Sequence, residues 1–411
     1  MLNTSKGYHT FSFFQRLSWE NYDSLMGNFN GYMQRDRRLH RCPIKDKKNP
    51  NKTLGWEYYY KPSRGMRWRM KPIKVSDNLT IHFVQIIVTP KVLTDNSFLA
   101  AATQCDIDKI EVLFNEESAK ISPILSKFGA CSVNRADPCL NLDTEEINLP
   151  CSVEQMMKLI KRGNIPRHYK EREKYDESAH RMKAADDSFY LVSGSTNINF
   201  YLKPRQLDNR FPECHEKENA RHLIRLEVQS KYPMLYSLSK GRQAESRFYE
   251  HEDSFSPEEF FERSEIGMKN PTIPIDIILS DKNSDEIIEK YFYKTVRKGN
   301  YLTLEGAIWM VKRCNFRRDK EERLINTLEL VNECRGISKA KAKLTDTDLR
   351  DFKRSLKDLD ALLINPVTIP RSWGIPYIPN LLRAYYDSVY ERIWVSNEHL
   401  FYKHLKEYFS F

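Results

Sequence analysis

The sequence predicts an α+β protein, in which a domain built on an antiparallel sheet precedes a mostly helical domain. Up to about residue 242, several segments alternate polar and apolar side chains with a period of two, as β-strands do. Beyond residue 243 the apolar side chains recur with the period of an α-helix. A chain of 411 residues is also long for one hydrophobic core, so more than one domain is expected.

These changes of pattern divide the chain into three parts. Residues 1–78 are predicted to be a basic N-terminal strand and insertion that belong to the first domain. Residues 79–242 are expected to carry the rest of that domain, and residues 243–411 the helical C-terminal domain. This division follows the switch in periodicity, because no internal repeat marks a boundary.

The first domain opens with a predicted strand at 8–16, followed by a long polar and basic insertion with Asn-Pro-Asn at 49–51. The nearly continuous apolar run at 79–91 predicts a central strand. A helix is expected from Asp106 onward. A second, short amphipathic helix is expected over 153–160, with Ser152 as its N-cap. The highly charged stretch 163–187 predicts a mobile loop.

The second domain is predicted from helical periodicity alone. The expected helices lie near 257–265, 284–293, 303–315, 320–335 and 346–363. The stretch 365–382 contains four prolines. Because proline lacks the amide hydrogen that a helix interior needs, we expect an irregular segment there.

Three predicted strands carry polar pairs on one face. Around residue 200, Asn197, Asn199, Tyr201 and Lys203 alternate with apolar side chains, so all four share one face. Arg225 and Glu227 share a face in the same way, and so do Arg135 and Asp137. Such a combination is unusual for a plain solvated surface. We interpret these segments as the working strands of a nuclease-like site.

The net charge of +10 is concentrated near the N-terminus. Residues 1–75 contain 16 Lys and Arg and 5 Asp and Glu, a balance of 16 − 5 = +11, so the rest of the chain carries −1. Aromatic side chains alternate with the bases at 55–72, a composition that suits phosphates and unstacked bases. We therefore expect Arg64, Arg67, Arg69 and Lys71 to bind DNA. The alternative is a solvated basic hairpin packed by its aromatics.

Other patterns exclude several classes of protein. No window approaches about 18 consecutive apolar residues, so no transmembrane segment is expected. The N-terminus lacks the order of a signal peptide. The eight cysteines are dispersed without a CxxC pair, which is typical of reduced thiols in a cytoplasmic protein.

Five motifs carry a resemblance to a known family. They are TPKVLTDN at 89–96, NRADPCLN at 134–141, NINFYLKPRQL at 197–207, LIRLEVQSKY at 223–232 and INPVTIPRSWGIPYIPNLL at 364–382. Together they resemble the gene II/X replication proteins, the rolling-circle initiators of filamentous phages and plasmids. The Arg-x-Asp, Tyr-x-Lys and Arg-x-Glu strands are also similar to trans-acting plasmid Rep proteins. The long basic N-terminal insertion departs from the pattern, and the family's two-histidine metal motif is missing.

The resemblance implies a metal-dependent, origin-specific nicking and joining endonuclease in residues 79–242. A tyrosine would attack one DNA strand and keep its 5′-phosphate as a phosphotyrosine ester. By this resemblance Tyr201 is the nucleophile, Lys203 the nearby positive charge, and Asp137 and Glu227 the ligands of Mg²⁺ or Mn²⁺. Arg135 and Arg225 would orient these carboxylates or contact phosphate. Double-stranded origin DNA, single-stranded DNA, a host helicase and a single-strand-binding protein are the implied partners, in a bacterial cytoplasm and without a membrane.

Each assignment has an alternative. The Arg-x-Asp and Arg-x-Glu pairs could be ordinary ion pairs, and Tyr201 a half-buried strand tyrosine. Tyr190 could replace Tyr201 as nucleophile, and His82 is expected to be a core or edge histidine. For the whole protein, the alternatives are a non-catalytic origin-binding or copy-control protein and a mobilisation relaxase. A pure DNA-binding protein has no use for carboxylates beside a phosphate backbone, whereas a nicking enzyme does.

Overall fold

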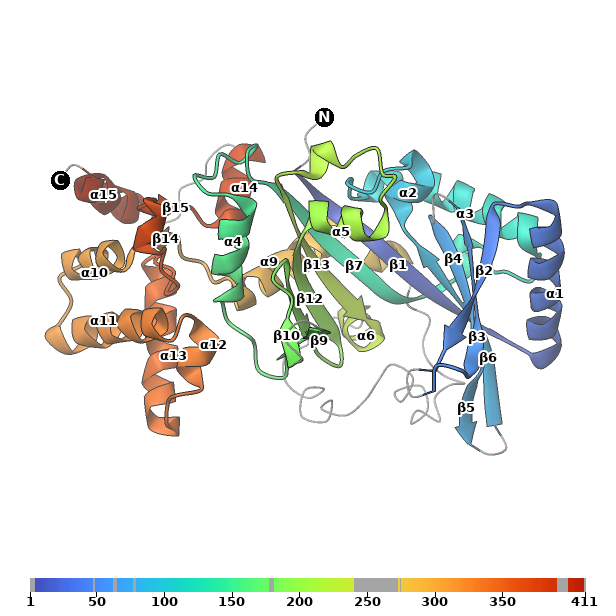
Figure 1. Cartoon of the computed structure of the whole chain (residues 1–411), viewed down its shortest axis with the longest axis horizontal. Coiled ribbons are helices and arrows are strands. Elements are labelled where there is room, and N and C mark those ends of the chain that lie inside the picture. The colour runs from blue at the N-terminus through green and yellow to red at the C-terminus, as the bar shows by residue number, and fades with distance from the viewer. Residues whose placement is uncertain are drawn as a thin grey trace.

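The computed structural model describes residues 4–46, 49–61, 65–76, 79–176, 181–239, 273, 275–389 and 398–409. Within them, an antiparallel sheet of eleven strands forms the framework (Figure 1). The strand order is β2-β3-β4-β6-β1-β7-β13-β12-β11-β8, and β5 pairs with β6. The strands of this sheet are β1 Ser5–Leu17, β2 Leu39–Lys45, β3 Thr53–Tyr60, β4 Met66–Met70, β5 Ile73–Ser76, β6 Leu79–Val88, β7 Ser132–Asp143, β8 Lys170–Glu171, β11 Ser188–Val192, β12 Thr196–Leu202 and β13 Leu223–Lys231.

Two short hairpins lie outside this sheet. They pair β9 (Glu173–Asp176) with β10 (Arg181–Ala184), and β14 (Tyr301–Leu302) with β15 (Tyr377–Ile378). The α-helices of the described residues are α1 Trp19–Arg35, α2 Pro90–Asp95, α3 Ile107–Ile121, α4 Val153–Lys161, α5 Lys203–Arg210, α6 Tyr232–Ser239, α8 Ile275–Ile278, α9 Asp281–Thr295, α10 Leu304–Arg313, α11 Arg318–Glu333, α12 Ile337–Lys341, α13 Asp346–Ala361, α14 Leu381–Val389 and α15 Glu398–Phe409.

One face of the sheet is apolar, and helices cover it. In the half that contains β1 to β6, Phe13 packs edge-to-face against Phe114 of α3, with ring centroids 5.6 Å apart. In the other half, strand residues such as Phe200 pack against α4 and α9. Burying an aromatic side chain of this size stabilises the fold by about 1.5–3 kcal/mol. The opposite face of the sheet is therefore free for polar side chains.

Helices α10, α11 and α13 lie beyond α4, at the end of the molecule away from α1 (Figure 1). Helices α10, α11 and α13 enclose a separate core that includes Leu324, Leu328 and Leu359. Tyr291 and Phe292 of α9 belong to the core of the sheet, to which Val331 of α11 and Phe352 of α13 also contribute. No helix within the described ranges is both long and apolar enough to cross a membrane.

The predicted fold class is confirmed. The opening strand, the central strand at 79–88, the capped helix α4 and four of the five predicted C-terminal helices are present. Ser152 caps α4 as predicted, accepting a hydrogen bond from the Gln155 amide. The fifth helix, near 257–265, lies outside the described residues. The proline-rich stretch 365–382 is irregular up to α14, apart from a short 3-10 turn and the two residues of β15.

Two segments fold differently from the prediction. The basic insertion is helix α1 and strands β2–β4, which extend the main sheet. Its aromatics provide the reason: Tyr58 and Trp68 are fully buried and pack on Phe29 of α1, with ring centroids 4.2 and 5.7 Å from that of Phe29. The predicted loop 163–187 contains β8, β9 and β10. Strand β8 is the edge strand of the main sheet, and β9 and β10 pair with each other outside it.

Candidate active site

Four neighbouring strands carry polar side chains on the face of the sheet opposite the apolar core. Strands β1, β7, β13 and β12 lie side by side in that order. The pairing sets Asp137 opposite Thr10 and Glu227 opposite Asn199. Residues opposed in an antiparallel pair point to the same face. The structure therefore brings the Asp137 and Glu227 side chains, predicted from separate segments, to one face of adjacent strands.

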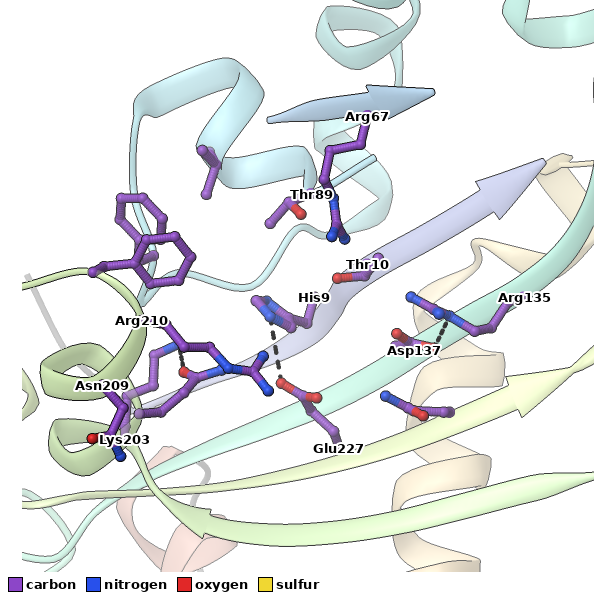
Figure 2. Close-up of a pocket in the computed structure, with 15 residues that line it drawn as sticks. His9, Thr10, Arg67, Thr89, Arg135, Asp137, Lys203, Asn209, Arg210 and Glu227 are labelled. Atoms are coloured by element: carbon purple, nitrogen blue, oxygen red, sulfur yellow. Dashed lines mark hydrogen bonds and ion pairs between the residues drawn. The ribbon is translucent and has the colours of Figure 1, made fainter. Parts of the chain in front are cut away.

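A cavity of about 600 Å³ separates this polar face from helices α2 and α5 (Figure 2). Its lining contains both of these carboxylates. It also contains four cationic side chains, which are Arg67, Arg135, Lys203 and Arg210. The formal charge of the six groups is 4 − 2 = +2, so the cavity attracts a polyanion even though two carboxylates line it.

The Tyr201 hydroxyl donates a hydrogen bond to Oε1 of Glu227. Burial and the negative charge of Glu227 raise the pKa of the phenol well above its ordinary value near 10. The phenol therefore stays protonated unless a base takes its proton, and Glu227 is placed to do so. A hydroxyl beside a carboxylate is the arrangement of a nucleophile with its base.

Tyr190 lines a second cavity together with Tyr201. This cavity has a volume of about 310 Å³ and shares Glu227 with the first. The hydroxyl of Tyr190 is bonded to amides: it accepts from Asn197 and donates to Gln229, each at 3.2 Å. Burial raises the pKa of this phenol too. Of the two tyrosines, Tyr201 is thus the one whose hydroxyl is seen to donate to a carboxylate.

His9 is a site residue that the sequence reasoning missed. Its Nδ1 lies 3.0 Å from a guanidinium nitrogen of Arg225, and its Nε2 lies 3.5 Å from Oε1 of Glu227. Burial and the charge of Arg225 hold the pKa of His9 well below its ordinary value, so the ring is neutral. A guanidinium can only donate, so Nδ1 accepts and the proton resides on Nε2, facing Glu227. His9 therefore positions the Glu227 carboxylate.

A β-bulge explains why the pattern of alternation did not identify His9. Tyr8 pairs with Pro138 and Thr10 pairs with Asp137, which leaves His9 as an extra residue of β1. His9 and Thr10 consequently both line the cavity, although adjacent strand residues normally point to opposite faces. His82 lies on β6, with its ring 5.0 Å from those of Trp19 and Tyr22, and lines neither cavity.

Arg225 is fully buried beneath this site. Its guanidinium donates to Oδ1 of Asn141 at 2.5 Å and to the carbonyls of Leu99 and Phe98, the latter at 3.2 Å. One of its nitrogens lies 3.8 Å from Glu227. Arg225 was expected either to orient a carboxylate or to contact a phosphate. Its placement favours the first role, because the side chain presents no surface to a phosphate.

We expect Arg225→Met to destabilise the protein by about 3 kcal/mol or more, because it leaves several buried acceptors without donors. Urea unfolding of the full chain measures this change. The matched control is Arg221→Met, since Arg221 is exposed and pairs with the exposed Glu218; we expect a change within about 0.5 kcal/mol there. A loss below about 1 kcal/mol for Arg225→Met would contradict the positioning role.

Asp137 is buried at the floor of the cavity, with Oδ1 3.0 Å from Nε of Arg135. Burial raises the pKa of Asp137 to about 7, against the lowering effect of the Arg135 charge. Oδ1 is itself buried, and its recorded contact is this ion pair. Asp137 lines the cavity, and a carboxylate in such a place is a suitable ligand for a hard cation.

The donor set fits Mg²⁺ or Mn²⁺ in an open site. Mg²⁺ is typically held by one or two carboxylates together with waters and substrate phosphate. Asp137 and Glu227 supply two carboxylates in one cavity. Within the part of the chain that is described, no group of three or more His, Cys, Asp or Glu side chains is placed to hold a metal ion. These residues thus provide no third protein ligand.

Lys203 corrects one detail of the sequence analysis. It was predicted to continue the polar face of the strand of Tyr201, but it is the first residue of α5. Pro204 explains the change, because its ring favours the first turn of a helix. The side chain still reaches the site: Nζ lies 6.0 Å from the centre of the Tyr201 ring and donates to Gln206 at 2.7 Å. Burial and the charge of Arg225 hold the pKa of Lys203 well below its ordinary value.

The predicted DNA-binding bases lie on and near β4. Arg67 lines the cavity, and Arg69 lies 3.0 Å from Glu57 on the same face. Arg64 lies outside the described residues, and Lys71 directly follows β4. The folded segment is a hairpin packed by its aromatics, which was the alternative interpretation of its structure. Its outward-facing arginines nonetheless adjoin the candidate site.

Comparison with known proteins adds little to this description. No protein family model matches the sequence. A search of curated proteins also finds no significant match. Among solved structures, a rolling-circle replication initiator protein from Geobacillus stearothermophilus aligns with 63% of this chain and 95% of its own, at 9% sequence identity and a TM-score of 0.26. A superposition this loose carries no argument about function.

Proposed function

We propose that the protein is a rolling-circle replication initiator that nicks and rejoins one DNA strand at an origin. The reaction would pass through a phosphotyrosine ester and use a divalent cation. The observation that carries this proposal is the hydrogen bond from Tyr201 to Glu227, beside Asp137 and the cationic lining of the cavity. The motifs that resemble gene II/X proteins supply the same residues from the sequence.

In this proposal each side chain has a defined task. Glu227 takes the proton of Tyr201 as the phenol oxygen bonds to phosphorus, the bond from phosphorus to the 3′-oxygen breaks, and the leaving 3′-oxygen takes up a proton from water. The cut strand keeps a free 3′-hydroxyl, and the phosphotyrosine conserves the bond energy for rejoining. Arg67, Arg135 and Arg210 hold the phosphates that flank the scissile one. Lys203, whose charge is costly while buried, becomes better stabilised when a phosphate oxygen reaches it.

Asp137 and Glu227 would hold the cation in the cavity. When bound, it would neutralise charge on the scissile phosphate and so assist attack by the phenol. His9 and Arg225 keep Glu227 in place through the contacts described above. The host helicase and single-strand-binding protein remain expectations of the family resemblance.

The direct test uses a supercoiled plasmid that carries the replication origin on which the protein would act, incubated with the protein and Mg²⁺ or Mn²⁺. We expect open-circular product and a covalent adduct on the 5′ end of the cut strand. A DNA-binding protein without chemistry would shift the plasmid and leave it uncut. Cleavage without an adduct would replace the tyrosine by an activated water molecule.

Neutralising Arg64, Arg67, Arg69 and Lys71 with Gln should weaken binding to duplex DNA of every sequence. The slope of the logarithm of the binding constant against the logarithm of the salt concentration should become less negative by about 0.9 for each phosphate that the protein no longer neutralises. Fluorescence anisotropy over a salt series measures both effects. An unchanged slope would mean that these bases are merely solvated, and the helical region around Arg313–Arg323 would then be tested next.

A further inference from the structure

A groove on the other side of the sheet has the chemistry of a second binding site. Helix α4 packs on β11, β12 and β13 against their apolar face, so it lies across the sheet from the candidate active site. The C-terminal end of α4, the end of α11 and the segment 370–373 enclose a hollow of about 610 Å³. Its lining residues are Lys158, Arg162, Asn332, Glu333, Arg335, Pro370, Ser372 and Trp373.

Three cations of this groove have no anionic partner. Among the described residues, Lys158, Arg162 and Arg335 form neither an ion pair nor a side-chain hydrogen bond. Burial and the charge of Arg335 lower the pKa of Arg162, so the two guanidinium groups repel each other. The one anion of the lining, Glu333, lies 3.3 Å from Lys343. An anionic ligand would therefore relieve an existing repulsion.

The backbone holds these cations close together at a cost. Arg335 has a φ of 54°, in the left-handed region that glycine prefers at the end of a helix. Gly336 follows, and the Ile337 amide donates to the carbonyl of Arg162 at 2.9 Å. A Cβ on Gly336 would lie 3.0 Å from that same carbonyl oxygen. The end of α11 is thus pinned against the end of α4, with Arg335 beside Arg162.

We infer that this groove binds single-stranded nucleic acid, with backbone phosphates on Lys158, Arg162 and Arg335 and a base stacked on Trp373. Trp373 is half-buried; it packs against the core and also lines the groove. Most of the lining is exposed, so the hollow is an open trough that suits a passing chain better than an enclosed small molecule. The inference does not depend on the nicking chemistry.

The test is the binding of fluorescein-labelled oligo(dT) to the full chain, measured by anisotropy over a salt series. In the variant Lys158→Gln, Arg162→Gln, Arg335→Gln, binding should weaken, and the salt slope should fall by about 2, or about 0.7 for each phosphate that the groove no longer neutralises. The matched control is Arg350→Gln, Arg354→Gln, Lys357→Gln, which removes two arginines and one lysine from exposed positions of α13. This control should leave the groove intact. Equal slopes in the two triple variants would overturn the inference.

Trp373→Phe provides a second, milder measurement. Stacking of a base quenches tryptophan fluorescence, so this variant should lose part of the quench that oligo(dT) causes while keeping its fold by circular dichroism. An undiminished quench would refute the stacking on Trp373.

A competition experiment tests the kind of ligand. If dATP displaces the oligonucleotide at equal phosphate concentration, the groove is a mononucleotide site and the assignment to single-stranded nucleic acid is wrong. Plasmid nicking assayed in parallel separates failure of this site from failure of the proposed function.

Discussion

Tyr201→Phe is expected to abolish the covalent protein–DNA adduct and to reduce plasmid nicking by at least about a thousandfold, since the nucleophile itself is removed. Only the phenolic oxygen is lost. The hydroxyl donates to Glu227, which keeps its contacts to His9 and Arg225. The fold and duplex binding should therefore change little, and the loss can be attributed to chemistry. Trapping the adduct on a labelled DNA fragment measures the effect directly.

Tyr190→Phe is the matched control for this experiment. Tyr190 lines the same cavity as Tyr201, but its hydroxyl hydrogen bonds are to amides. We expect this variant to nick and to form the adduct at close to the normal rate. Sequencing the tryptic peptide that retains the label then identifies the nucleophile. A label on the peptide that contains Tyr190 would exchange the roles of the two tyrosines.

The faces of the working strands could be predicted because strand periodicity is a local property. In β12 the apolar Ile198 and Phe200 lie in the core, while Asn199 and Tyr201 line the second cavity. The same alternation places Glu227 on the cavity side of β13. A period of two requires only the identities of neighbouring residues. Which strands become neighbours depends on pairing over long distances, so the polar pattern could group these segments into one site without giving their order in the sheet.

Two features of the site depend on contacts that the sequence pattern does not encode. The bulge that turns His9 toward Glu227 arises from pairing between β1 and β7, more than 120 residues apart. The burial of Arg225 depends on carbonyls of residues 98–99, which belong to an irregular segment. By contrast, the start of helix α5 at Lys203 is encoded locally, because Pro204 marks a helix start in the sequence itself. The alternation of polar residues up to Lys203 obscured that signal.

The burial of the Tyr58 and Trp68 aromatics shows why composition alone misleads. Bases interleaved with aromatic residues are typical of nucleic-acid surfaces, yet here Tyr58 and Trp68 are opposite each other on the buried face of β3 and β4, whereas Arg67 and Arg69 lie on the other face. Arg67 and Arg69 face the cavity side, and Trp68 packs beneath α1. The charge asymmetry therefore still favours DNA binding. The aromatics are explained by the hydrophobic core.

The variants Asp137→Asn and Glu227→Gln are expected to lose nicking by at least about a hundredfold while duplex binding stays equal or becomes tighter. Each change keeps the shape of the side chain and removes one negative charge from a cavity that faces phosphate, so repulsion of DNA decreases. Glu227→Gln also removes the base for Tyr201. Comparing nicking with anisotropy on the same duplex separates these effects.

Binding of Mn²⁺ discriminates a ligand role from a purely structural one. Titration of the DNA-free protein, followed by the electron paramagnetic resonance of free Mn²⁺, should give weaker binding for both variants than for the parent chain. The matched control is Asp143→Asn, a buried carboxylate on the same strand β7 that does not line the cavity. Normal Mn²⁺ binding by Asp137→Asn would remove Asp137 from the proposed cation site. If Glu227→Gln binds Mn²⁺ normally but no longer nicks, Glu227 acts as the base and is not a ligand of the cation. Its partner at the reacting centre would then be the hydroxyl of Tyr201.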